Sequence, residues 1–153
     1  MAEPRWLNED EMRLFRAFLA AYSGITSRLD SLLKASTGFT LDDYEVLVHL
    51  SESPDHRARM GELSDQLLHS RSRLTQRIDR LVSKGLVERE KCDSDARGTW
   101  AVLTPTGFDA LRDAAPEHVE HVREHLFAHL SEDEVPAMMQ ILERLAAGVR
   151  PGS

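Results

Sequence analysis

The chain has one cysteine in 153 residues, and no apolar run approaches the roughly 18 residues of a membrane-spanning helix. A single cysteine excludes an intramolecular disulfide, so we expect a protein of the reducing cytoplasm with no membrane partner. The sequence also lacks a Gly-rich phosphate loop, a nucleophile elbow and a Cys/His zinc signature. These absences argue against an enzyme, and we expect no catalytic residue, no metal ion and no cofactor.

The net charge of −7 argues at first against a nucleic-acid partner, but the charges are unevenly distributed. Residues 56–98 contain ten Lys/Arg and seven Asp/Glu, whereas the rest of the chain contains nine Lys/Arg and nineteen Asp/Glu. Positive charge is therefore concentrated in the central segment. Charge fluctuates by this much in many chains, so the distribution alone does not establish a partner.

Residues 70–85 are predicted to form one helix with two different faces. Ser70 suits its N-cap, and Gly85 suits the left-handed position just beyond its last turn. A helix that buries one apolar stripe and exposes Arg, Thr, Gln and Ser could enter the DNA major groove. The stripe consists of Leu74, Ile78, Leu81 and Val82, and the polar face of Arg71, Arg73, Thr75, Gln76, Arg77, Arg80 and Lys84.

A long helix is predicted at the start of the chain, over residues 8–36. Asn8 and Glu11 are spaced as in a capping box, and Gly38 follows the last turn. Such a helix is about 40 Å long, which is more than a small domain can cover. We therefore expect part of its apolar stripe to pack against a second subunit.

The central segment, residues 40–104, is predicted to form a winged helix-turn-helix. Thr40 caps a helix that ends at residues 53–56, and a short helix over 60–68 precedes the basic helix. Residues 86–91 and 99–104 are predicted to be two strands joined by a polar loop, which makes them a wing.

Two further helices are predicted after the wing. Thr104 caps the first, in which Pro116 should cause a kink or a break, and Ser131 begins a capping box for the last. Residues 105–149 would join 8–36 as dimerisation helices. The predicted fold is mainly α with a small two- or three-stranded β wing, in a single domain over 1–153.

Three groups of residues resemble the MarR family of winged-helix transcriptional regulators. They are Leu74–Arg89 with the run LTQRIDRLVSKGLVER, the DARG motif at 95–98 followed by Val102-Leu103-Thr104 and Gly107, and YEVLVHL at 44–50. The resemblance covers residues 8–149. It implies a homodimer whose terminal helices interlock and whose two winged helices grip a pseudo-palindromic operator. Many members are repressors released by small aromatic or anionic ligands or by thiol oxidation.

The predicted DNA-contacting residues lie on the basic helix and on the wing. Arg71, Arg73 and Thr75 should contact phosphates or base edges, and Gln76 or Arg77 should read a base. The family commonly has Arg where this chain has Gln76, and Gln favours adenine, so base preference cannot be copied from relatives. For Asp79 and Arg80 we favour a structural ion pair that locks the helix to the wing. The full set is Ser70, Arg71, Ser72, Arg73, Thr75, Gln76, Arg77, Asp95 and Arg97, with Asp95 bracing the wing turn and Arg97 entering the minor groove.

An effector pocket is predicted between the long helices and the winged domain, because the resemblance implies one there. Aromatic residues at helical spacing are more often simply core, and this alternative stays open. Arg16 or His56 could meet an anionic ligand. The candidate lining residues are Trp6, Arg16, Tyr22, Tyr44 and His56.

A run of histidines and the single cysteine have open roles. His118, His121, His125 and His129 share one side of a helix, where a polar face or a dimer seam is favoured over a pH-responsive seam or a metal site. Ligands at i, i+4 and i+8 on a straight helix span about 12 Å, so no more than two could bind one ion. Peroxide-sensing members of the family that the chain resembles have their reactive cysteine near the N-terminus, where this chain has none, so a redox role of Cys92 is disfavoured.

The sequence therefore predicts a sequence-specific, DNA-binding transcriptional regulator that acts as a homodimeric, ligand-responsive repressor on double-stranded operator DNA. The alternative is a winged helix used as a protein-interaction module without specific DNA binding. The array of arginines on one helix argues against this alternative, because such a module does not need it.

Overall fold

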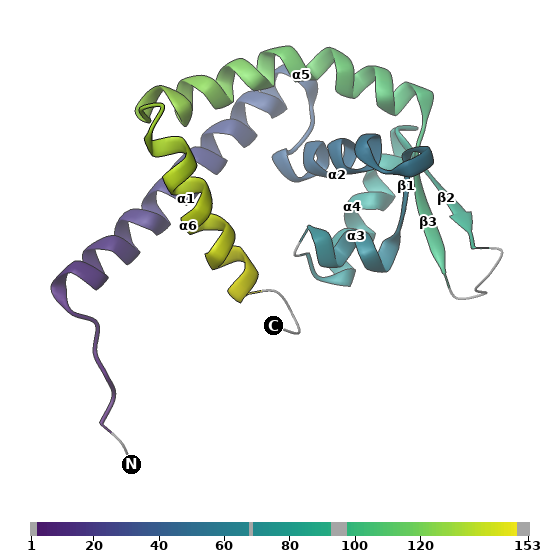
Figure 1. Cartoon of the computed structure of the whole chain (residues 1–153). Helices are drawn as coiled ribbons and strands as arrows, with labels where there is room; N and C mark the ends of the chain where they lie inside the picture. Colours follow the sequence, from purple (N-terminus) through teal and green to yellow (C-terminus); the bar gives the residue numbers. More distant parts are fainter. Residues whose placement is uncertain (1–2, 68, 93–97, 150–153) are drawn as a thin grey trace.

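The computed structural model describes residues 3–67, 69–92 and 98–149. A small body formed by the central helices and a sheet lies at one end, and long helices extend away from it (Figure 1). In chain order the elements are α1 (Glu9–Thr37), α2 (Leu41–Glu52), the 3₁₀ turn η1 (Pro54–His56), β1 (Arg57–Arg59), α3 (Met60–Gln66), α4 (Arg71–Ser83), β2 (Val87–Lys91), β3 (Thr99–Leu103), α5 (Pro105–His125), the 3₁₀ turn η2 (Phe127–His129) and α6 (Glu134–Gly148). The mainly α prediction with a small β wing is confirmed.

Helix caps set the boundaries of α1, α2 and α4. Asn8 and Glu11 form the expected capping box, and Gly38 ends α1 with a φ of 76°. Thr40 caps α2 reciprocally with Asp43, and Ser70 accepts a hydrogen bond from the amide of Arg73 at the start of α4. Each cap satisfies amide groups that a helix end would otherwise leave unpaired.

The core lies where α2, α3 and α4 pack together and against the sheet. Its centre consists of side chains with almost no exposed surface, because each helix turns its apolar stripe toward the same point. These side chains include Leu47, Leu50, Leu63, Leu74, Ile78, Leu81 and Val87. Burial of the stripe of α4 leaves the opposite side of this helix facing outward.

The sheet has three antiparallel strands in the order β1-β3-β2. The hairpin of β2 and β3 is the predicted wing, with Val87 opposite Leu103. The additional strand β1 pairs along the other edge of β3, with Ala58 opposite Ala101. Three residues are too few to show an alternating pattern, so the sequence did not place this strand. Asp55 and His56, both with positive φ, turn the chain into it.

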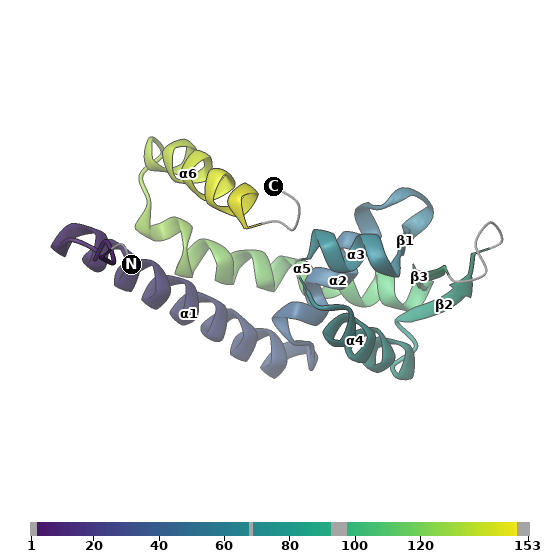
Figure 2. The ribbon, with the colours of Figure 1, turned by 90° about the horizontal axis from the view of Figure 1, so that it is seen from below.

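The long helices α1 and α5 lie side by side, and α6 lies on the side of α5 away from α1 (Figure 2). Helix α5 continues through Pro116 to His125, so Pro116 does not split the helix, and the alternative of a kink stays a prediction. The carboxylate of Glu134 accepts a hydrogen bond from the amide of Ser131, which is half of the predicted capping box, and α6 begins at Glu134. Among the described residues, no helix is both long and apolar enough to cross a membrane.

Many apolar side chains on the long helices remain exposed in a single chain. Helix α6 has no buried residue at all, although it carries several large apolar side chains. An apolar helix face without cover is typical of a surface that another chain occupies. The exposed set includes Leu14, Phe15, Phe18, Leu19 and Tyr22 on α1, and Met139, Ile141, Leu142 and Leu145 on α6.

The start of α5 makes a very close contact with the junction between α4 and β2. A Cβ atom added at Gly107 would lie 2.1 Å from the carbonyl oxygen of Leu86 and 2.8 Å from a methyl group of Leu103. The amide of Thr104 also donates to the same Leu86 carbonyl at 3.1 Å. Only glycine fits this position, so Gly107 fixes where the long helices leave the winged body.

Substitution of Gly107 tests this contact. We expect Gly107→Ala to lower the free energy of unfolding by about 3 kcal/mol, because the added carbon overlaps a backbone atom that cannot move aside. Denaturant unfolding followed by circular dichroism measures the loss. Gly61→Ala is the matched control, since a Cβ there meets nothing within 4 Å. Equal stability of the two variants would contradict the contact.

Candidate nucleic-acid interface

The outward side of α4 and its cap form an exposed polar surface, which we call the reading face. Ser70 is positioned by its cap, and its hydroxyl lies 3.3 Å from that of Ser72. Arg71 and Arg73 extend from the first turn into solvent, and the hydroxyl of Thr75 donates to the carbonyl of Arg71 at 2.8 Å. The reading face consists of Ser70, Arg71, Ser72, Arg73, Thr75 and Gln76, all exposed.

Arg77 does not belong to the reading face, so its predicted exposure toward DNA is wrong. Only 6% of its surface is exposed. Its guanidinium group pairs with Asp42 and lies 3.7 Å from Asp43 and 3.3 Å from the hydroxyl of Thr40. All three partners are at the start of α2, so Arg77 attaches α4 to α2. On a helical wheel of α4, Arg77 lies near the boundary between the apolar stripe and the polar face. The sequence therefore does not show whether its side chain points to solvent or to the core, and its ion-pair partners on α2 decide this.

Asp79 and Arg80 both make structural ion pairs, but not with each other. Asp79 pairs with Arg89 of β2 at 2.5 Å, which confirms the predicted link between α4 and the wing. Arg80 instead pairs with the buried carboxylate of Asp43 at 3.2 Å. Helix α4 is therefore held on one side by α2 and on the other by β2, and its reading face lies between these attachments.

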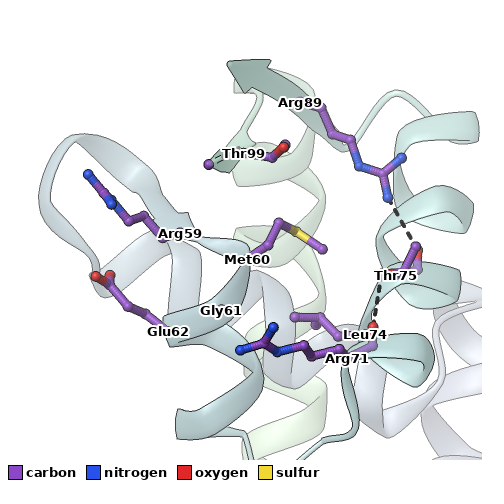
Figure 3. Close-up of a pocket in the computed structure, with 10 residues that line it drawn as sticks. Arg59, Met60, Gly61, Glu62, Arg71, Leu74, Thr75, Arg89 and Thr99 are labelled. Carbon is purple, nitrogen blue, oxygen red and sulfur yellow. Dashed lines mark hydrogen bonds between the residues drawn. The ribbon is translucent and has the colours of Figure 1, made fainter. Parts of the chain in front are cut away.

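A hollow of about 640 Å³ lies between α4, the start of α3 and the wing. Arg59, Arg71 and Arg89 stand around it, and Met60 and Leu74 form apolar parts of its wall (Figure 3). Arg89 also donates to the carbonyl of Thr75 at 3.4 Å. The sequence analysis missed this site, because its residues come from β1, α3, α4, β2 and β3.

The base of the wing carries further positive charge. The guanidinium groups of Arg57 and Arg59 lie 4.8 Å and 5.3 Å from the ring centre of Trp100, at cation–π distance. Arg57 also lies 3.7 Å from Glu90 of β2, on the far side of the central strand β3. The predicted wing contacts Asp95 and Arg97 lie outside the described residues, so their roles stay predictions.

The five predicted effector residues do not form one pocket within a single chain. Trp6, Arg16 and Tyr22 lie exposed along the N-terminal helix and the segment before it, with Trp6 83% exposed. Tyr44 is buried in the winged body against the ring of His118. His56 packs on Phe108 and bonds to the carbonyl of Ser51 through Nδ1. The prediction that these side chains converge is wrong for one chain, because α1 carries the first three away from the body.

The histidine run and the cysteine occupy ordinary structural environments. His118 is half-buried at the α2–α5 contact, where burial and then the neighbouring His121 lower the pKa of its imidazole. His125 lies 3.8 Å from Glu124, and His129 is exposed in η2. Cys92 is buried at the end of β2, where its amide donates to the carbonyl of Gly98. The roles left open for these residues stay open.

The buried pairing of Arg77 is expected to stabilise the fold. Arg77→Met should lower the free energy of unfolding by about 3 kcal/mol, since it removes the partner of Asp42 and one of the two cations beside the buried carboxylate of Asp43. Arg71→Met is the control, because this exposed arginine should affect stability little. Chemical denaturation of both variants measures the difference. A stable Arg77→Met variant would show that the network is dispensable.

Comparison with known proteins gives a consistent result. The MarR family model matches residues 37–98. The structure of Sco3205, a MarR family transcriptional regulator from Streptomyces coelicolor in complex with DNA, is 38% identical, with a TM-score of 0.94 over 98% of this chain and 94% of that chain. The transcriptional repressor MprA of Escherichia coli (strain K12) is 29% identical over 135 residues, which is 88% of this chain and 76% of that protein.

A further relative extends the similarity along almost the whole chain. The HTH-type transcriptional regulator MhqR of Bacillus subtilis (strain 168) is 25% identical over 147 residues, covering 94% of this chain and 97% of that protein. The similarity thus includes the long helices as well as the winged body. With the helix-turn-helix, the wing and the close Gly107 contact in place, the chain belongs to the MarR family of transcriptional regulators.

Proposed function

We propose that this protein is a homodimeric repressor that binds a pseudo-palindromic operator in double-stranded DNA in the cytoplasm. The observation that carries the proposal is the orientation of α4. Its apolar stripe and Arg77 are buried, while the reading face is exposed. Each protomer would place this face in one major groove, with the two half-sites about one helical turn apart.

The charge of the winged body supports DNA as the partner. Residues 56–98 carry an excess of basic side chains within an acidic chain. Arg71 and Arg73 are exposed in the first turn of α4, where phosphate contacts would position the helix, and Gln76 could bond to the edge of adenine. A protein-interaction module does not need such a face. The Sco3205 relative was solved with DNA, which also favours this function over the alternative.

The exposed apolar surface of the long helices supports the dimer. Two copies could cover each other's α1 and α6, whose large apolar side chains lack cover in one chain. Dimerisation would also fix the distance between the two copies of α4. A ligand could bind more tightly to a dimer conformation in which the two α4 helices are wrongly spaced for DNA. It would then lower DNA affinity, by an amount set by its difference in affinity for the two conformations.

The hollow beside α4 is a candidate place for a small anionic effector. Arg59, Arg71 and Arg89 lie around it with one acid, Glu62, and Met60 and Leu74 supply apolar contact; Arg89 is also paired with Asp79. An anion held there would use Arg71, which belongs to the reading face, so it would compete with a DNA phosphate. It is a second candidate beside the pocket predicted from Trp6, Arg16, Tyr22, Tyr44 and His56, which a single chain does not assemble.

The DNA contacts are tested by substitutions on the reading face. Arg71→Ala and Arg73→Ala should each weaken operator binding and reduce the slope of log K against log salt by about one, since each removes one phosphate contact. Fluorescence anisotropy at several salt concentrations measures both quantities. Arg112→Ala on α5, far from this face, is the control. Unchanged affinity at fixed salt, or binding that does not fall with salt, would favour the protein-interaction alternative.

The dimer is tested on α1. Phe18→Glu should convert the protein to a monomer at micromolar concentration, because a charge would be buried in the proposed interface. Ala20→Glu places the same charge about 200° around the helix and should leave the dimer intact. Analytical ultracentrifugation distinguishes the two states. A wild-type protein that sediments as a monomer would overturn the dimer directly.

A further inference from the structure

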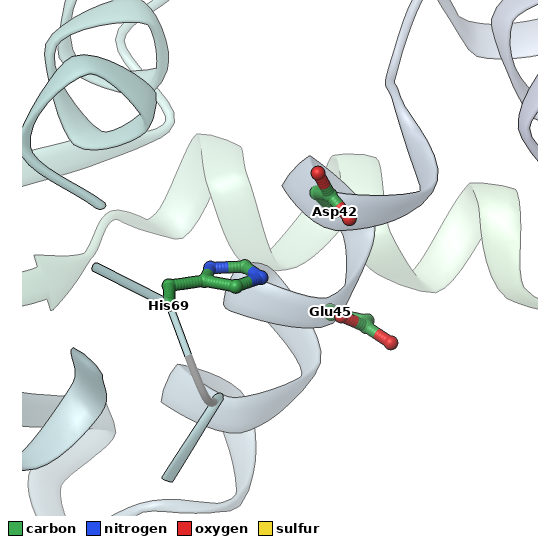
Figure 4. Close-up of side chains that lie close together, drawn as sticks. All are labelled: Asp42, Glu45 and His69. Carbon is green, nitrogen blue, oxygen red and sulfur yellow. The ribbon is translucent and has the colours of Figure 1, made fainter. Parts of the chain in front are cut away.

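Three side chains with metal-binding atoms lie close together beside the start of α4. Asp42 and Glu45 are in the first turns of α2, and His69 is in the turn between α3 and α4. One ligand atom from each side chain lies within 4.8 Å of the other two. Figure 4 shows the imidazole ring of His69 pointing toward the two carboxylates. The sequence analysis did not single out this group, because Glu45 and His69 are 24 positions apart.

Part of the binding capacity of these side chains is unused, although Asp42 already pairs with Arg77. Arg73 and Arg77 both approach Oδ2 of Asp42, and no described residue bonds to Oδ1. The carboxylate of Glu45 makes no hydrogen bond or ion pair with any part of the chain that the structure describes. Among the described residues, Nδ1 of His69 has no hydrogen-bond partner, and the other ring nitrogen, Nε2, faces the carboxylates in Figure 4. An arrangement of two carboxylates and an imidazole with so few partners has room for a cation.

The environment of Glu45 and His69 disfavours the charged form of each side chain. Desolvation and then the charge of Asp42 raise the pKa of Glu45, although Arg77 offsets part of this effect. Burial, with Arg77 and Arg73 nearby, lowers the pKa of His69, and Asp42 opposes this shift. The imidazole is therefore neutral at pH 7 and has a lone pair to offer. It therefore adds no positive charge beside Glu45, whose carboxylate has no ion-pair partner among the described residues.

We propose that Asp42, Glu45 and His69 bind one divalent transition-metal ion of the Zn²⁺ type. Three protein ligands with water in the fourth position are a common arrangement for such ions, and an imidazole favours them over Mg²⁺ or Ca²⁺. Tetrahedral ligand atoms lie about 3.4 Å apart, so the three side chains close by roughly 1 Å on binding. Glu45 is exposed and can make this movement.

The bound ion would join α2 to the turn from which α4 begins. Its ligand Asp42 also contacts Arg73, so metal occupancy changes the surroundings of one side chain of the reading face. The site itself does not depend on DNA binding. It would add a metal-responsive element to the recognition unit, separate from the hollow and from the histidine run.

The test is a calorimetric titration of the metal-free, full-length protein with ZnCl₂ in the absence of DNA. We expect one ion per protomer at this site. Glu45→Gln and His69→Gln should each weaken binding at least about tenfold, because each removes one ligand. Glu52→Gln and His49→Gln, also on α2, are matched controls and should bind as the wild type does. Mg²⁺ at the same concentrations should not bind.

Several results would overturn the proposal. They are the absence of Zn²⁺ binding, wild-type affinity in both ligand variants, and equal binding of Mg²⁺. Loss of binding in His121→Gln or His125→Gln, with retention in His69→Gln, would place the ion on the histidine run instead. Thermal unfolding without metal checks that the two ligand variants fold, since neither side chain has a partner to lose. Operator binding by the metal-free protein, measured in parallel, reports on the proposed function separately.

Discussion

The orientation of the recognition helix depends on a buried pairing between α4 and α2. Arg77 reaches inward from α4 and meets Asp42, Asp43 and Thr40, which together form the first turn of α2 and its cap. Asp43 has two roles here, because it accepts the cap amide of Thr40 as well as the charge of Arg80. A buried charge is costly unless it is paired, so this constellation permits only one rotation of α4 about its axis. That rotation presents the reading face to solvent and hides the apolar stripe.

The arginines of the central segment fall into two groups, those that hold α4 in place and those that are exposed. Arg77 and Arg89 hold α4 in place, one toward α2 and the other toward the wing through Asp79. Arg71 and Arg73 are exposed at the first turn, although Arg73 also lies 3.9 Å from Asp42. Arg57 stacks on Trp100 at the base of the wing. The positive charge of the central segment is therefore partly structural, and counting it overstates the charge that faces a partner.

Most of the architecture could be predicted, because it depends on local signals. The capping box of Asn8, the cap at Ser70 and the left-handed glycine at 85 act within one turn of the chain, and all three appear in the structure. What could not be predicted depends on contacts between distant segments. The inward turn of Arg77, the pairing of β1 with β3 and the group formed by Glu45 and His69 each require the tertiary fold. The separation of the predicted effector residues within one chain has the same origin, since aromatic spacing along α1 does not show how far that helix extends from the body.

The close approach of Gly107 to Leu86 has a mechanical consequence. It clamps the root of α5 to the corner where α4 passes into β2. No side chain lies between the two backbones, so none can change rotamer to accommodate a movement of α5 relative to the winged body. A tilt of the long helices would therefore rotate the winged body as a rigid unit. In a two-fold assembly, small changes far out along α1 and α6 would alter the separation of the paired recognition helices without deforming either body.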